Sequence, residues 1–237
     1  MTMKIQDIEI EIIRKDIKNL HLYVLPPSGA VRISAPLSIS DENIRLFASS
    51  KISWIRAQQN KFAKQLRHSE REFVSGETIY IFGKQYYLQI EYSNKANNFL
   101  LEGEKAILTV RKESTVKQRE NYVNEVLRKY LKNEINRLLP IWEQKTGLQC
   151  KRWLVKYMKT RWGTYSKTTG AISFNLQLAH KPVECLEFII VHELGHITYR
   201  NHSKGFIAYM DTFLPYWRET KNKLNTLTLD YIDEQKN

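Results

Sequence analysis

Two histidines and a glutamate form the segment of this sequence with the clearest chemical meaning. Val191-His192-Glu193-Leu194-Gly195-His196 contains the pattern H-E-x-x-H, and a third histidine, His202, follows further along the chain. On a helix, residues four apart lie on one face one turn apart, so His192 and His196 can share one tetrahedral zinc ion. Glu193 lies beside them, where a carboxylate can take a proton from zinc-bound water. The segment therefore predicts a zinc hydrolase.

The surrounding sequence favours this prediction over the alternative of a core helix with two structural histidines. Apolar residues run up to and through the motif, as a buried helix over about 183–199 requires. Pro182 stands near the first turn of that helix, where proline is tolerated.

Spacing alone leaves the third ligand open. Six residues on one helix correspond to about 600°, so His202 can join the pair only if the helix ends soon after His196 and the chain turns back. Residues 199–201 permit such a turn, because Asn201 can enter the left-handed conformation at modest cost and Ser203 can cap a following helix. Two carboxylates of that next helix are the alternative ligands: Asp211 and Glu219.

Length and composition narrow the class of protein. A chain of 237 residues with 42% hydrophobic residues can bury one core or two small ones. No stretch approaches the roughly 20 apolar residues of a membrane span, and the N-terminus lacks the apolar core of a signal peptide. Cys150 and Cys185 are too few for a disulfide framework, and their spacing fits no zinc pair. We expect a cytoplasmic protein with no membrane partner.

The charge is strongly positive and uneven. The net charge is +12, and residues 117–161 hold twelve Lys or Arg against four Glu, a net charge of +8. Aromatic residues are interleaved there, so the segment is a candidate surface for nucleic acid. We favour the alternative, a solvated helix face with aromatic residues in the core, because many basic proteins bind DNA only loosely.

The order of predicted elements indicates an α+β fold. We predict strands at 7–15, 20–25 and 30–34, a helix from Ser40 to about Arg67, and a β-rich stretch over 72–111. A long helix should run from Ser114 to Pro140, with a restart up to Gly147. A hairpin of strands 153–158 and 171–176, the motif helix and a last helix over about 203–224 complete the chain. The division is a β-rich N-terminal region with one helix, 1–112, and a zincin-like region, 113–237.

Several separated motifs together resemble the YgjP-like metallopeptidases, which are related to the SprT-like and minigluzincin proteases. The motifs extend over essentially the whole chain, and those of the C-terminal half are the more specific. They are Arg161-Trp162-Gly163, Ile172-Ser173-Phe174-Asn175, the H-E-x-x-H segment, Asn201-His202-Ser203 and, more weakly, Val31-Arg32-Ile33-Ser34-Ala35-Pro36 and residues 82–88. One departure is Thr164-Tyr165, where family members often have Ser-Cys after the Arg-Trp-Gly turn.

The resemblance implies that His192, His196 and His202 bind Zn²⁺ and that Glu193 is the catalytic carboxylate. The expected reaction is hydrolysis of a peptide bond by Glu193-activated, zinc-bound water, with Tyr199, Arg161 or Tyr165 as the oxyanion donor. An extended peptide could pair with the edge of the strand at 171–176.

Three functions compete at this point. The first is a zinc metallopeptidase of protein or peptide substrates that acts near DNA. The second is a zinc-dependent nucleoside triphosphate pyrophosphatase, although no phosphate-cradling glycine loop supports it. The third is a non-catalytic, zinc-stabilised nucleic-acid-binding protein, which the open three-histidine ligand set disfavours.

Overall fold

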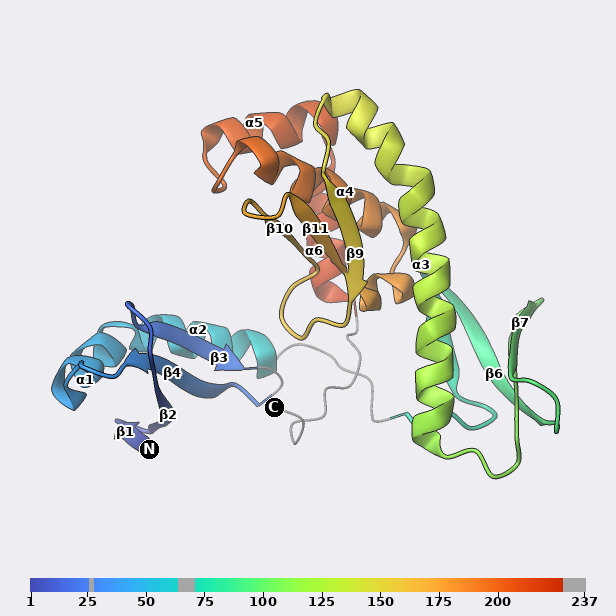
Figure 1. Ribbon diagram of the computed structural model, residues 1–237, viewed down its shortest axis with the longest axis horizontal. Coiled ribbons are helices and arrows are strands. Elements are labelled where there is room, and N and C mark those ends of the chain that lie inside the picture. The colour runs from blue at the N-terminus through green and yellow to red at the C-terminus, as the bar shows by residue number, and fades with distance from the viewer. Residues whose placement is uncertain (26–27, 64–70, 228–237) are drawn as a thin grey trace. The chain divides into compact units, whose positions relative to one another are not determined.

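The computed structural model describes residues 1–25, 28–63 and 71–227, which form two compact units (Figure 1). The described residues up to 63 belong to the first unit, and those from 71 onward belong to the second. No described helix is both long enough and apolar enough to cross a membrane.

The first unit is a four-stranded sheet with two helices. The strands lie in the order β1-β2-β4-β3, with β2 parallel to β4 and the other pairs antiparallel. Alternating apolar residues of β2 and β4 meet helix residues such as Ile44 and Ile55 in one core, which explains the period-2 pattern of the sequence. The elements are β1 (Thr2–Ile5), β2 (Ile8–Lys15), β3 (His21–Leu25), β4 (Ala30–Pro36), α1 (Asp41–Ser50) and α2 (Ile52–Ala63).

The single helix predicted from residue 40 to 67 is wrong within the described residues, because the chain breaks at Lys51 into α1 and α2. The Ser50 hydroxyl donates to the Phe47 carbonyl, the normal acceptor for the Lys51 N–H. That N–H bonds to the Ala48 carbonyl instead. The predicted start is confirmed, with Ser40 as the N-cap. The predicted end at Arg67 and the start of the 26–29 turn lie outside the described residues.

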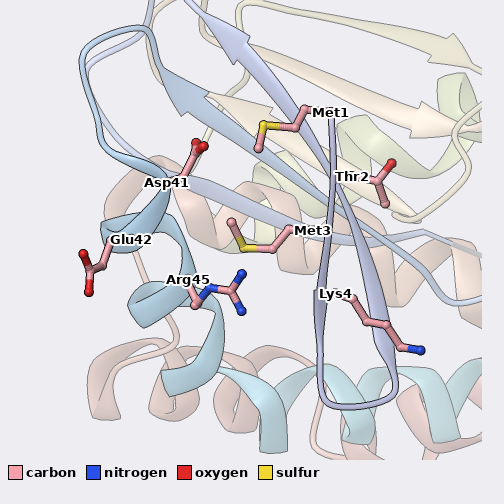
Figure 2. A pocket seen from close by; sticks show the side chains of 7 residues that line it. All are labelled: Met1, Thr2, Met3, Lys4, Asp41, Glu42 and Arg45. Atoms are coloured by element: carbon pink, nitrogen blue, oxygen red, sulfur yellow. The ribbon is translucent and has the colours of Figure 1, made fainter.

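A surface depression of the first unit lies between β1 and the start of α1 (Figure 2). Its lining mixes methionines with both basic and acidic side chains, and none of the predicted site residues reaches it: Met1, Thr2, Met3, Lys4, Asp41, Glu42 and Arg45.

The second unit begins with another four-stranded sheet, in the order β5-β6-β8-β7, followed by the long helix α3 (Val116–Thr146). The prediction that the helix stops at Pro140 and starts again is wrong, because this exposed proline lies inside one continuous helix. Proline removes one hydrogen bond from a helix, and the packing of Leu138, Leu139 and Trp142 holds the helix on both sides. Gly147 ends α3 in the left-handed conformation, as predicted. The strands are β5 (Thr78–Ile81), β6 (Lys84–Tyr92), β7 (Asn98–Glu102) and β8 (Lys105–Val110).

A three-stranded sheet follows α3, and its topology differs from the predicted hairpin. β9 (Arg152–Lys156) pairs in parallel with β11 (Ala171–Asn175), so the two predicted strands exist but form no hairpin. The antiparallel partner of β11 is β10 (Gly163–Ser166), which the sequence did not reveal. β10 is short and half-buried along its whole length, so it lacks the alternation by which a strand is recognised.

The C-terminal part contains the short helix η1 (Leu176–His180), the motif helix α4 (Val183–Thr198), α5 (Lys204–Phe213) and α6 (Trp217–Thr226). α4 agrees with its predicted range, whereas the last predicted helix is two helices. The cause is Pro215, since the residue before a proline is disfavoured in helical conformation and Leu214 ends α5 with a φ of −140°.

The boundary predicted between residues 112 and 113 falls inside the second unit, between β8 and α3. Apolar residues of β5–β8, such as Leu88 and Leu108, share one core with Val123 and Leu127 of α3, so this sheet does not pack separately (Figure 1). The Phe82 N–H also donates to the Ala179 carbonyl just before α4. The division into functional regions stays a prediction.

Candidate metal centre

Helix α4 places the first two histidines one turn apart on one face. Between Cys185 and Gly195, all residues of this helix except Glu187 and His192 are buried, so packing fixes the orientation of its central part. The Nε2 atoms of His192 and His196 lie 3.2 Å apart. The i, i+4 geometry predicted from the sequence is therefore present.

The chain turns back after α4 and brings His202 to the pair. α4 ends at Thr198, Tyr199 is extended, and the Nε2 atom of His202 lies 3.1 Å from that of His192. The expectation that Asn201 adopts the left-handed conformation is wrong. Asn201 is not among the described non-glycine residues with positive φ, which are Gln6, Phe73 and Phe82. Ser203 precedes α5, as predicted, although its side chain makes no capping hydrogen bond.

Phe206 forms the floor of the histidine cluster. Its ring is 1% exposed, and its centroid lies 5.0, 4.9 and 4.8 Å from the ring centroids of His192, His196 and His202. A side chain at Gly195 would meet the rings of Phe206 and Tyr209 at 3.0 Å or less. The glycine inside the motif is therefore needed for α5 to pack closely enough to support all three imidazoles.

The three histidines fit a tetrahedral metal ion. Their ligand atoms all lie within 4.8 Å of one another. Two nitrogens that each lie about 2.0–2.1 Å from a tetrahedral ion are about 3.3–3.4 Å apart, close to the two separations in the cluster. His196 Nδ1 lies 2.9 Å from the Tyr199 carbonyl, which can only accept, so Nδ1 carries the proton and Nε2 keeps its lone pair.

The alternative third ligands do not join this group. Asp211 accepts hydrogen bonds from the side chains of Trp217 and Arg218 instead, and Glu219 is exposed on α6. Over the described parts of the chain, the three histidines are the one group of three or more ligand side chains close enough to hold an ion.

Burial lowers the proton affinity of the first histidine. It depresses the pKa of His192 to about 3, and the nearby charges of His196, His202 and Lys221 act in the same direction. The pKa of His202 is lowered as well, by burial first and then by His196 and Lys221. A low pKa keeps the imidazole neutral, the form that binds a metal ion.

Glu193 is enclosed beside the histidines, with 4% of its surface exposed. Burial raises the pKa of this carboxyl to about 8, against the opposing effects of a hydrogen bond from the backbone N–H of Tyr165 and the positive charge of Arg161. A pKa near neutrality suits a group that both accepts and returns a proton.

Gly163 explains part of the Arg-Trp-Gly motif. A Cβ atom there would lie 2.7 Å from Ile189 Cγ2 and 2.8 Å from the Glu193 carboxylate oxygen Oε1. Only glycine lets β10 approach α4 this closely, so the motif shapes the wall against which Glu193 rests.

Asn175 holds the loop that leads into β10. This side chain is 3% exposed; its Nδ2 donates to the carbonyls of Met158 and Arg161, each at 2.7 Å, and its Oδ1 accepts from the backbone N–H groups of Met158 and Gln177. The backbone N–H of Asn175 also donates to the Trp162 carbonyl. The asparagine of the Ile-Ser-x-Asn motif thus fixes the path of the Arg-Trp-Gly turn.

The predicted pairing of a peptide with the strand at 171–176 is wrong. β11 is the central strand of its sheet, and β9 and β10 occupy its two edges. The outer strand beside Glu193 is β10. Among the oxyanion candidates, the Tyr199 ring packs against Phe206 and Tyr209, whereas Arg161 is exposed.

A cluster of three imidazoles beside an enclosed carboxylate, on one helix and the turn that follows it, defines a metal-dependent hydrolase. Residues 18–227 match the family described as "YgjP-like, metallopeptidase domain". The chain belongs to this family, so the resemblance seen in its motifs is confirmed. It is a metallopeptidase, which implies a divalent metal ion and a protein or peptide substrate.

Two solved structures are also similar to this chain. The metallopeptidase zymogen abylysin of Pyrococcus abyssi is 20% identical, with a TM-score of 0.38 and coverage of 41% of this chain and 99% of that one. The metallopeptidase zymogen jannalysin of Methanocaldococcus jannaschii is 22% identical, with a TM-score of 0.35 and coverage of 38% and 92%. The comparison with functionally curated proteins finds no match.

Proposed function

We propose that this metallopeptidase is a zinc enzyme in which His192, His196 and His202 hold the ion and Glu193 transfers the protons. The observation that carries the proposal is the convergence of three Nε2 atoms beside one enclosed carboxylate. A zinc ion bound there would act as a Lewis acid, polarise the scissile carbonyl and lower the pKa of water to about 7.

The chain itself supplies the proton transfer and the positioning. Glu193 accepts a proton from the attacking water and returns it to the leaving amine, and the burial that raises the pKa of this carboxyl favours its return of the proton. The backbone N–H of Tyr165 holds the carboxylate in place. Arg161 is the best-placed candidate for stabilising negative charge in the transition state, because its charge already acts on Glu193.

The outer strand β10 is the candidate partner for an extended peptide. Backbone pairing along an edge strand holds a substrate without requiring a particular sequence, and Gly163 and Tyr165 bring this edge to Glu193.

The metal proposal is tested by elemental analysis of the purified wild type and of His202→Ala. We expect about one zinc per chain in the wild type and a large loss in the variant. His21→Ala is the matched control, because this exposed histidine belongs to β3 of the first unit. If His202→Ala kept its full zinc content, His202 would not be a metal ligand. If the wild type bound a different metal, the proposal that this is a zinc enzyme would be rejected.

The proton-transfer proposal is tested with Glu193→Gln, which keeps the shape of the side chain and cannot act as a base. We expect normal zinc content and at least a hundredfold lower kcat/KM on a mixture of peptides analysed by mass spectrometry. Glu184→Gln, on the same helix but ion-paired to Lys223, should retain activity. Full activity of Glu193→Gln would refute the role of Glu193. Pyrophosphate release from nucleoside triphosphates, measured in parallel, would reveal a pyrophosphatase.

An association with DNA rests on the surface charge. On α3, Glu120, Glu125 and Glu134 pair with three of the basic residues. Lys151, Arg152 and Lys156 are exposed on and beside β9. We expect weak duplex DNA binding that falls steeply with salt, measured by fluorescence anisotropy. Binding that is absent at low salt would remove this part of the proposal.

We also propose a cytoplasmic location, which the two free thiols of Cys150 and Cys185 support. A fluorescent fusion imaged in cells would test it.

A further inference from the structure

The basic residues of α6 differ in whether a carboxylate neutralises them. Arg218 pairs with Asp211, and Lys223 pairs with Glu184. Lys221 lies between them in sequence and is exposed; within residues 1–25, 28–63 and 71–227, no carboxylate lies within ion-pair distance of its ammonium group. Its charge is therefore available to a ligand.

A short series of ring contacts connects Lys221 to the metal centre. Its Nζ lies 5.7 Å from the centroid of the Trp217 ring. The Trp217 ring stacks on Phe188, with centroids 6.4 Å apart and an angle of 5° between the planes, and the Phe188 ring meets His192 at 5.7 Å. The contacts Lys221–Trp217–Phe188–His192 therefore run from the exposed ammonium to the ligand cluster.

The electrostatics agree with this proximity. The Lys221 charge contributes to the lowered pKa of both His192 and His202. Arg161 supplies a second positive charge from the side of Glu193. Three described carboxylates on α4 or near Lys221 in sequence already have partners: Glu184 pairs with Lys223, Asp211 pairs with Arg218, and Glu187 accepts a hydrogen bond from the Trp142 indole. Glu219, on α6, is exposed. A divalent ion would make the site more positive still.

We propose that Lys221 binds a carboxylate of the peptide substrate, so that the enzyme prefers substrates with a negative charge near the scissile bond. This inference rests on the proposed function, because it assigns a substrate class to the same centre. A compact ammonium on a flexible stem suits a single carboxylate. A polyanion such as DNA would call for several unpaired cations side by side, whereas both neighbouring cations on α6 are neutralised.

The carboxylate can come from an Asp or Glu side chain or from a free C-terminus, and matched peptides distinguish the two. One pair differs by Glu against Gln at positions flanking the scissile bond, and a second differs by a free against an amidated C-terminus. Lys221→Met removes the charge and keeps an apolar side chain over Trp217, whereas Lys221→Arg restores the charge. Lys129→Met, an exposed lysine of α3, is the matched control.

We expect wild-type kcat/KM to be about two- to fivefold higher for the carboxylate-bearing member of one pair, mainly through KM, because an exposed charge contributes to binding of substrate and transition state alike. Lys221→Met should abolish this preference and leave the neutral peptide unaffected, and Lys221→Arg should largely restore it. The pair that shows the effect identifies the source of the carboxylate.

Three results would overturn the inference: no preference in the wild type, an equal loss on both members of a pair in Lys221→Met, or a loss limited to DNA binding. Calorimetry of the same peptides with the zinc-loaded Glu193→Gln variant, with and without Lys221→Met, separates this inference from the proposed function. If the wild type cleaves no peptide, the proposed function fails. The role of Lys221 would still be supported if the carboxylate-bearing peptide bound more tightly than its neutral counterpart and this difference depended on Lys221. Equal binding of both peptides would exclude it.

Discussion

Replacing Asn175 with alanine should affect both stability and catalysis, although none of the hydrogen bonds of this side chain goes to Glu193 or the three histidines. It removes four hydrogen bonds of a side chain that is 3% exposed. The two that Nδ2 donates are 2.7 Å long and contribute about 1 kcal/mol each. The two that Oδ1 accepts are 3.2 Å long and contribute about half as much.

Together the four hydrogen bonds contribute about 3 kcal/mol to the free energy of unfolding. Met158 is half-buried and Arg161 is exposed, so water can reach part of the freed backbone, and we expect a loss of about 2–3 kcal/mol in the free energy of unfolding. Urea unfolding of the zinc-loaded protein measures this loss. Because Asn175 fixes the turn that carries Arg161 and Gly163 to Glu193, kcat/KM should fall at least tenfold at temperatures where the variant remains folded.

Leu127→Ala is the control for stability alone. Leu127 is 1% exposed in α3, and its truncation should lower the free energy of unfolding by about 2–5 kcal/mol while activity is retained. A stability loss below about 0.5 kcal/mol in Asn175→Ala, or an activity loss no greater than that of Leu127→Ala, would refute the positioning role.

Three further predictions follow from the site and the long helix. In the metal-free protein, Glu193 has a pKa of about 8 against an ordinary 4.5, so it contributes stability below pH 4.5 that is lost as the pH rises to about 8. Urea unfolding should show that Glu193→Gln removes this decline, while the opposite trend from His192, whose pKa is lowered, persists in both proteins. Gly163→Ala should reduce kcat/KM at least tenfold with zinc retained, because the added Cβ displaces Glu193, whereas Gly103→Ala, with nothing within 4 Å, should change stability alone. Thr115→Ala breaks the capping box of α3 with Gln118 and should lower the free energy of unfolding by about 1 kcal/mol with activity unchanged, so a larger loss or any activity change would contradict a purely local role.

The sequence determined the parts of this protein that depend on local geometry. The i, i+4 spacing of His192 and His196 fixes their relation as soon as a helix forms, and the buried helix was evident from its apolar run. The alternation in β2 and the left-handed Gly147 at the end of α3 were equally readable, because strand pleat and positive φ leave direct marks on residue type.

Other elements were misjudged where a local competition or a parallel pairing decided the outcome. The Ser50 hydroxyl divided one predicted helix, and Pro215 divided another. β10 escaped notice because a short strand that is half-buried along its whole length shows no alternation. Parallel pairing of β9 with β11 connects segments far apart in the chain, and no local pattern encodes that choice.

Only the tertiary structure assembled the rest of the centre. The turn after α4 brings His202 within reach, and Phe206, from the next helix, supports all three imidazoles. The Tyr165 backbone at Glu193, the hold of Asn175 on its loop and the path from Lys221 to His192 each join residues from separate elements. Such contacts depend on how helices and strands pack against one another, and that packing is settled by the whole core, so the sequence near each residue does not contain it.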